Sequence, residues 1–395
     1  MLAQRTVLFK SSSIAAAWTA AEAAAACGDQ IIDLTAGEIW SELAPSIREG
    51  AIAAINCSSN RYTGTLGLLK LRHALARKIS ADTAQSWSAD EIAVTSGAKQ
   101  ALFNAAMALL NPGDEVLVPA PCWTSFPVQI GLAGGTPVFI DTRHNSYVPK
   151  LADLAAAVTS KTKAILVNTP SNPTGVIYDR STLAGIAQLA IDRDLWIIFD
   201  ECYGAFAHAP HTHHPIVSVA PSVRDRTLIV NSFAKSLALT GWRIGYLAAP
   251  KTVISAVGSL QSYMSCPDVI AQHALLNHLE SGDAAFQLQL QRHVANARAL
   301  GLSILSTLKS VPQPAAQGGY YFYLDLVGWQ RRANRYGHEI NADDVANVLL
   351  MDAGVATVSG TAFGDPAGVG LSYGIDLKLL DKALRRLTVA LNTWK

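Results

Sequence analysis

The sequence has few cysteines, few charges and no long apolar run, and each shortage argues against a class of protein. Its five cysteines form no C-x-x-C pair, which argues against a disulfide scaffold and a cysteine zinc site and predicts a reduced, cytoplasmic protein. Only 15% of the residues are charged and the formal net charge is +1, so nothing attracts the chain to nucleic acid or to an anionic membrane. No apolar run reaches the ~18–20 residues that a membrane-spanning helix needs.

What the sequence does have is length and hydrophobicity. Its 395 residues, half of them hydrophobic, exceed the size of roughly 250–300 residues at which a single core stops growing. We therefore expect residues 46–280 to form a large domain, and residues 1–45 with 281–395 to form a smaller α+β domain. The alanine-rich segment 11–28 predicts a capped helix rather than a signal peptide, because Thr19 and Glu22 interrupt it.

Short apolar segments alternate with helix-like segments through the middle of the chain. The apolar segments are EIAVTSG, DEVLVPAP, TPVFID, KAILVNTP, LWIIFDE and TLIVNSF. This alternation predicts an α/β fold with a mainly parallel sheet sandwiched between helices. Ligands of such sheets bind beyond the carboxyl ends of the strands, so the polar residues there are the functional candidates.

Two isolated cations lie in the segment NSFAKSLALTGWRIGY, residues 231–246. A lysine buried among apolar residues has a depressed pKa, which a Schiff-base lysine requires, so Lys235 is a candidate nucleophile. The alternative is a lysine that extends to solvent. Arg243 suits a bidentate grip on a phosphate, with a structural salt bridge as the alternative.

Asp200 ends LWIIFD, a very apolar predicted strand. A carboxylate there needs a cation or a hydrogen-bond donor as its partner. The protonated pyridine nitrogen of pyridoxal phosphate (PLP) is one such partner, and a helix N-cap or a local ion pair is the alternative.

The segment TSGAKQ places Gly97 and Ala98 at a strand-to-helix turn, where backbone N–H groups can bind phosphate. An ordinary tight turn is the alternative. Ser232 can add a hydroxyl to such a site or cap the end of its strand.

Three further residues follow strand ends. Asn172, in NTPSNPTG, and Tyr203, in FDECYG, can hold one phenolate oxygen from two sides, although NTPSNPTG is locally only a turn signal. Trp123 offers a flat face for stacking on a cofactor ring, with core packing as the alternative.

In their order along the chain, these motifs resemble those of the class I/II aminotransferases, which are PLP-dependent enzymes of fold type I. The resemblance is to the bacterial aspartate-aminotransferase-like subgroup in particular. It covers nearly the whole chain, from SSSIAAAWTAAEAAAACGDQIIDLTAGE through NRYTGTLGLLKLRHALA to GTAFG and LSYG. The ordered set is highly specific.

The resemblance implies a role for each motif. Lys235 corresponds to the lysine that forms the Schiff base with PLP and carries the proton, and Asp200 to the partner of the pyridine nitrogen. Asn172 and Tyr203 correspond to the partners of the ring hydroxyl, and Trp123 to the stacking ring. The phosphate cup corresponds to Gly97, Ala98, Lys99, Ser232 and Arg243. We expect Lys235 and Arg243 both to be buried, because the cofactor compensates their charges.

Two more residues take roles from the resemblance. Tyr62 corresponds to the tyrosine that reaches the phosphate of the partner subunit, which implies a homodimer. Gly37 corresponds to the backbone contact with the substrate.

One position departs from the family's pattern. The segment GDPAGVGLSYG has Gly370 where the family carries an arginine that binds the substrate α-carboxylate as a fork-to-fork pair. Loss of such a pair should weaken carboxylate binding by several kcal/mol. Three explanations stay open. In the first, another cation replaces the arginine: Arg61, Lys378 or a histidine of HAPHTHHPI.

In the second explanation, the substrate is unusual, such as an amine, a modified carboxyl group or a bulky metabolite. In the third, the chemistry is not transamination but β- or γ-elimination, replacement, decarboxylation, carbon–carbon bond formation or annulation, with S-adenosylmethionine among the candidate substrates. We favour an aminotransferase of atypical specificity in specialised metabolism, acting on a small molecule that is an amino acid or amine.

Other classes of function fit less well. His208, His211, His213 and His214 suggest a metal site, but adjacent histidines share one ion poorly and no carboxylate or thiolate is spaced with them, so we predict a surface loop near the site entrance and no metal. A PLP-sensing DNA-binding regulator is disfavoured by the near-neutral charge and by a chain that starts at the aminotransferase-like N-terminal helix. A catalytically silent homologue is disfavoured by the intact Lys235.

Overall fold

The computed structural model describes residue 3, residues 6–7, residue 19, residues 31–334 and residues 340–394. Of the helix predicted for residues 11–28, only Thr19 is described, so that prediction lies outside the described residues. No helix in the described ranges combines the length and the apolar character that crossing a membrane requires.

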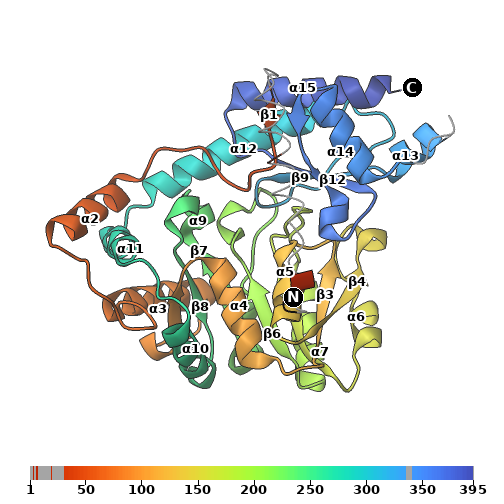
Figure 1. Ribbon diagram of the computed structural model, residues 1–395. Helices are drawn as coiled ribbons and strands as arrows, with labels where there is room; N and C mark the ends of the chain where they lie inside the picture. The colour runs from red at the N-terminus through yellow and green to blue at the C-terminus, as the bar shows by residue number, and fades with distance from the viewer. Residues whose placement is uncertain (1–2, 4–5, 8–18, 20–30, 335–339, 395) are drawn as a thin grey trace.

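A seven-stranded sheet forms the centre of the molecule (Figure 1), with the strand order β2-β8-β7-β6-β5-β3-β4. Neighbouring strands run parallel except β8, which is antiparallel to both of its neighbours. The prediction of a mainly parallel sheet is therefore confirmed, although it did not include β8. The strands are β2 (Ile92–Thr95), β3 (Glu115–Ala120), β4 (Thr136–Asp141), β5 (Thr162–Asn168), β6 (Trp196–Asp200), β7 (Thr227–Ser232) and β8 (Gly245–Ala248).

Both faces of this sheet are buried except at its edge strand β4, which explains why the inner strands are apolar throughout rather than alternating. In β5, Ala164 and Leu166 join one hydrophobic cluster, and Ile165 and Val167 join the other. The first cluster includes side chains of α4 (Ala98–Leu109), α5 (Ser125–Leu132) and α10 (Lys251–Tyr263). The second includes those of α3 (Leu69–Thr83) and α7 (Arg180–Asp192).

Shorter or flanking helices complete this part of the chain. They are α2 (Pro45–Asn56), α6 (Leu151–Ala157), α8 (Ile216–Val219), α9 (Phe233–Ser236) and α11 (Val269–Ser281).

The C-terminal part builds a second, smaller set of sheets above the large one (Figure 1). An antiparallel sheet has the order β11-β12-β9, and β1 pairs in parallel with β10. Because β1 comes from the start of the described chain, both ends of the sequence contribute here. The division of the chain into residues 46–280 and residues 1–45 with 281–395 stays a prediction. The elements are β1 (Ile32–Asp33), α12 (Ala285–Leu305), β9 (Tyr321–Asp325), α13 (Val327–Asn334), α14 (Ala342–Met351), β10 (Val355–Ala356), β11 (Val358–Ser359), β12 (Gly368–Ser372) and α15 (Leu377–Thr393).

The prediction of a histidine-bearing surface loop is wrong for His208. That imidazole is 6% exposed, and its Nε2 lies 2.9 Å from the Gly319 carbonyl oxygen and 3.1 Å from the Tyr373 hydroxyl. His213 lies 3.0 Å from the Glu201 carboxylate in a mostly buried pair. These two imidazoles are held inward by polar partners, which the sequence spacing does not reveal. In the described part of the chain, no group of three His, Cys, Asp or Glu side chains is placed to hold a metal ion.

Candidate active site

A cavity of about 720 Å³ lies beyond the carboxyl ends of the central parallel strands. Asn168, Asp200 and Ser232 end the strands β5, β6 and β7, and all three line it. Its opposite wall comes from the segment after β1 and from β12. The cavity therefore lies where the sheet order predicts a ligand site, between the large sheet and the smaller ones.

Most of the predicted site residues meet in this cavity. Its lining includes Gly37, Ala98, Lys99, Trp123, Asn172, Asp200, Tyr203, Ser232, Lys235, Arg243 and Gly370. Gly97 lies directly before Ala98 at the start of α4. Tyr62 is the exception, because it is absent from the lining and its side chain is fully exposed.

Lys235 lies on α9, the single helical turn that follows β7. The Ser232 hydroxyl caps this turn by accepting a hydrogen bond from the Ala234 backbone N–H at 3.1 Å. The Lys235 ammonium donates to the Gly37 carbonyl and lies 5.7 Å from the centre of the Tyr203 ring. Burial lowers the pKa of Lys235 to about 8. The fraction of uncharged amine at neutral pH is therefore far larger than for a free lysine, and the uncharged form is the one that attacks a carbonyl carbon.

Asp200 is the last residue of β6 and is only 5% exposed. One carboxylate oxygen accepts a hydrogen bond from the Cys202 backbone N–H at 3.0 Å. Burial raises the pKa of Asp200 to about 6. A carboxylate held in this way is stabilised by a cation brought into the cavity, as a protonated pyridine nitrogen would be.

Two side chains converge on the Tyr203 hydroxyl. The Asn172 amide nitrogen lies 3.4 Å from it, and the Tyr321 hydroxyl lies 2.8 Å from it. The Asn172 backbone N–H in turn donates to the Asn168 side chain at 2.8 Å, which fixes the loop after β5. Asn172 and Tyr203 therefore form a paired polar surface suited to one ligand oxygen.

The turn before α4 forms a cradle that only glycine fits. Gly97 has φ +79°, and a Cβ there would lie 2.6 Å from Nη2 of Arg243. This proximity arises because β2 and β8 pair Thr95 with Gly245, which brings two distant segments together. Helix N-terminal N–H groups and a guanidinium at one point form an anion site.

Arg243 differs from its prediction in one respect. It is exposed rather than buried, and its Nη1 donates to the Thr240 carbonyl at 2.8 Å. Its guanidinium borders the open side of the cavity. The burial of the next residue, Ile244, did not extend to Arg243.

Lys99 and Trp123 lie together on the wall beside α4. The Lys99 ammonium is 5.4 Å from the centre of the Trp123 ring, and Phe126 packs edge-on against the same ring at 5.4 Å. The indole is therefore fixed from one side and open toward the cavity, as a stacking platform requires.

Sequence reasoning missed two tyrosines, Tyr320 directly before β9 and Tyr321 at its start. Tyr320 donates from its hydroxyl to the Gly37 carbonyl at 3.0 Å, and Tyr321 lines the cavity. The signal was present in YYFYLD, where Tyr321 and Tyr323 alternate onto one face of a strand.

Gly370 lies in the middle of the β12 wall. It pairs with Val358 on one side and Tyr323 on the other, and a Cβ at Gly370 would lie 3.1 Å from the Phe363 ring. Among the described residues of this wall, none is cationic: they are Val358, Phe363, Gly370, Leu371 and Ser372. Arg61, Lys378 and His208, which were candidates to replace a missing arginine, do not line the cavity of this protomer.

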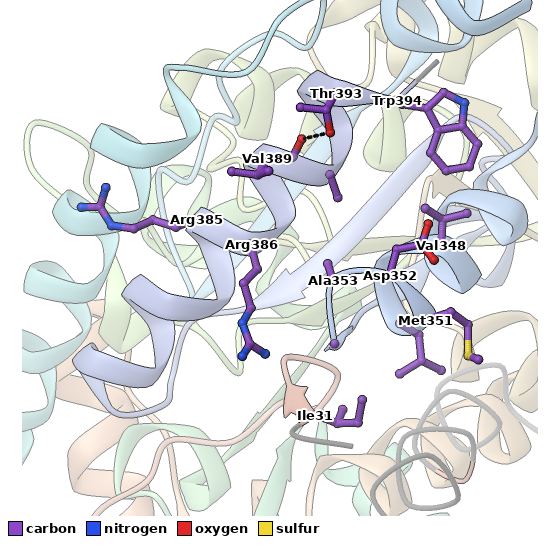
Figure 2. A pocket seen from close by; sticks show the side chains of 13 residues that line it. Ile31, Val348, Met351, Asp352, Ala353, Arg385, Arg386, Val389, Thr393 and Trp394 are labelled. Carbon is purple, nitrogen blue, oxygen red and sulfur yellow. Dashed lines mark hydrogen bonds between the residues drawn. The ribbon is translucent and has the colours of Figure 1, made fainter. Parts of the chain in front are cut away.

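A larger cavity of about 1040 Å³ lies elsewhere, between α15 and the end of α14 (Figure 2). Arg386 of α15 and Trp394, directly after α15, face it together with Met351 of α14. It contains none of the predicted site residues, and its described lining pairs no nucleophile with a base. Size alone therefore does not locate the chemistry.

The cavity around Lys235 contains groups suited to each part of PLP. It combines a buried amine of lowered pKa, a buried carboxylate at a strand end and a glycine cradle beneath a guanidinium. Together with the mainly parallel sheet, this set defines a PLP-dependent enzyme of fold type I.

Comparison with known proteins agrees. The family "Aminotransferase class I and II" matches residues 29–387. The chain is 35% identical to the aspartate/prephenate aminotransferase of Cereibacter sphaeroides over 382 residues, covering 96% of this chain and 95% of that one. A solved aspartate aminotransferase from Thermus thermophilus with maleate superimposes with TM-score 0.91 at 35% identity, covering 99% of both chains. The aspartate aminotransferase of Rhizobium meliloti gives TM-score 0.93 at 30% identity over 100% of both.

The chain therefore belongs to the class I and II aminotransferases. It is a transferase enzyme, and its cofactor is PLP.

Proposed function

We propose that the chain is an aminotransferase of atypical substrate specificity, acting on an amino acid or amine in specialised metabolism. The observation that supports this proposal is the contrast between the side of the cavity around Lys235 and the opposite side around Gly370. The cofactor side has every group that PLP needs, whereas the Gly370 wall has no cation among its described residues. The relatives named above act on aspartate and prephenate, and such carboxylate substrates are normally held by a guanidinium.

When bound, PLP supplies the electron sink that lets bonds at the substrate's α-carbon break. The protein's residues provide the rest. The Lys235 amine would hold the cofactor's aldehyde carbon and carry a proton at Nζ, since burial keeps its pKa near the working range. Asp200 would keep the ring nitrogen protonated, and Asn172 with Tyr203 would hold the ring oxygen.

The remaining roles concern the phosphate and the substrate. The start of α4 at Gly97 and Ala98, with Lys99, Ser232 and Arg243, would hold the phosphate. Trp123 would stack on the ring and exclude water from its face. The Gly37 carbonyl, which accepts from both Lys235 and Tyr320, would position the substrate next to the amine.

Tyr62 would act in a neighbouring subunit. Its side chain is fully exposed and is absent from the cavity of its own protomer, which supports a role in a partner's site. A homodimer follows from this proposal, and in it Arg61, the residue before Tyr62, would also lie toward the partner subunit. The cytoplasmic location stays a prediction from cysteine content.

A second function is favoured by the same absence of a cation at Gly370. Without a guanidinium to fix the α-carboxylate, the bond aligned for cleavage can differ, which suits elimination, replacement or carbon–carbon bond formation. The two functions share all of the cofactor-side residues and differ in products.

A single-turnover absorbance scan separates the two functions. Holoenzyme would be mixed with aspartate, alanine, several amines and S-adenosylmethionine, and the products identified. Formation of pyridoxamine phosphate with release of a keto acid or aldehyde supports transamination and names the donor. Return of the cofactor as PLP with a leaving group released supports the second function. Holoenzyme that reacts with nothing in the panel, while Lys235→Ala behaves identically, would refute both.

A further inference from the structure

Arg143 lies behind the Gly370 wall, outside the cavity and outside every motif of the sequence analysis. It follows β4, the edge strand of the seven-stranded sheet. The preceding residue, Thr142, is fixed to the end of β3, because its N–H and its hydroxyl both donate to the Ala120 carbonyl, at 3.0 and 2.7 Å. Arg143 therefore extends from a rigid part of the large sheet.

Its guanidinium contacts two carboxylates of the small sheet. Nη1 donates to Asp325 at 2.7 Å, and Nη2 donates to Asp365. Asp325 ends β9, and Asp365 lies in the loop before β12. The side chains of Arg143 and Asp325 are about a quarter exposed, whereas that of Asp365 is only 7% exposed. This is a largely buried charged cluster rather than a surface ion pair, and such clusters depend on every partner being present.

Asp365 organises the loop that carries Phe363. Its carboxylate accepts from the Tyr323 hydroxyl at 2.7 Å and from the Ala367 backbone N–H at 3.0 Å. Its own N–H donates to the Gly360 carbonyl at 2.8 Å, closing the turn. The Phe363 carbonyl accepts from the Cys122 N–H at 3.0 Å, next to Trp123. The loop is thus attached to the large sheet at two points, and Arg143 provides the charged one.

We propose that Arg143 is a positioning residue for the substrate cavity. By holding Asp325 and Asp365, it keeps Phe363 against Gly370 and fixes the wall on which part of the substrate rests. The inference uses the proposed function only in that substrate occupies this cavity. Without Arg143, Asp365 is a buried carboxylate with neutral donors alone, so it moves toward water and takes the loop with it.

The test compares Arg143→Gln with wild type by hydrogen exchange of the holoenzyme without substrate. We expect backbone N–H groups of residues 358–368 to exchange at least severalfold faster, and those of residues 95–101 and 231–243 to be unchanged. The visible absorbance of bound PLP should also be unchanged. Arg385→Gln is the matched control, because it removes an exposed arginine–aspartate pair on α15.

A second arm uses turnover of the best amino donor from the panel above. Arg143→Gln should raise KM about tenfold while kcat changes less than about threefold, and Arg143→Lys should recover part of the loss. Asp365→Asn should behave like Arg143→Gln, and the double variant should be no worse than either, because the two residues act as a unit.

Unchanged exchange in residues 358–368 would overturn the proposal, as would a lower melting temperature with KM unaltered. If no donor in the panel reacts, the proposed function fails, and the exchange arm still decides the role of Arg143.

Discussion

Replacing Gly370 by arginine should raise activity toward ordinary amino acids. The new guanidinium would extend from the middle of β12 into the cavity. A buried, hydrogen-bonded charge pair contributes about 2–5 kcal/mol to binding, as judged from truncation of such pairs. The structure opposes part of this gain, because a Cβ at Gly370 already lies 3.1 Å from the Phe363 ring. Overpacking of this kind costs about 1–3 kcal/mol.

Taken at the middle of both ranges, the net gain in binding free energy is about 1.5 kcal/mol, which corresponds to a rise of roughly tenfold in kcat/KM for aspartate or alanine. Keto-acid formation followed through a coupled dehydrogenase measures it directly. Gly370→Ala and Gly370→Gln are the controls, since they add volume without a charge. Equal activity of the arginine and glutamine variants, with cofactor absorbance and folding intact, would refute the idea that a missing cation at this wall limits carboxylate binding.

Three further predictions concern the cofactor side. Burial lowers the pKa of Lys235 from 10.5 to about 8, so the folded apoprotein favours the neutral amine. The free energy of unfolding of the apoprotein should therefore rise by up to about 3 kcal/mol between about pH 8 and pH 10.5. Urea titrations across this pH range measure the rise, which should be absent in Lys235→Met. Gly97→Ala should weaken PLP binding about tenfold or more, because its Cβ would lie 2.6 Å from Arg243. Gly113→Ala is the control, because Gly113 has a similar φ of +92° but an added Cβ would meet nothing within 4 Å. Its affinity for PLP, measured by equilibrium dialysis, should be unchanged. Mixing Tyr62→Ala with Lys235→Ala after subunit exchange should restore activity that neither variant has, since one site of each mixed dimer is complete; a mixture as inactive as its components would contradict shared sites.

The ends of the parallel strands could be predicted from the sequence, and with them most of the cavity. Asp200 and Ser232 each follow a short apolar run, and a parallel sheet brings such ends to one edge. The strand β8 could not be predicted, because its four residues follow directly on the segment of Arg243 and carry no turn signal. The burial of His208 depends on partners more than a hundred residues away along the chain, which local patterns do not contain.

The wall at Gly370 shows the same limit more clearly. The motif located Gly370 itself, but the packing of Phe363 against it comes from a turn closed by Asp365. The contacts of Arg143 join segments that are 182 and 222 residues apart. Pairing of charges over such separations is set by the tertiary arrangement of the two sheets. It therefore cannot be predicted from the spacing or periodicity of residues in the sequence.

The pairing of β2 with the reversed strand β8 has a consequence for how the chain acquires its cofactor. Thr95 and Gly245 become neighbours only when these two strands join, and the loop-closure entropy of such a distant pairing makes it slow to form. Gly97 and Arg243 are therefore not yet close together in any folding intermediate in which β2 and β8 have not paired. We therefore expect PLP to bind after these strands have joined. By mass action, bound PLP then shifts the folding equilibrium away from every form in which the two strands have separated again.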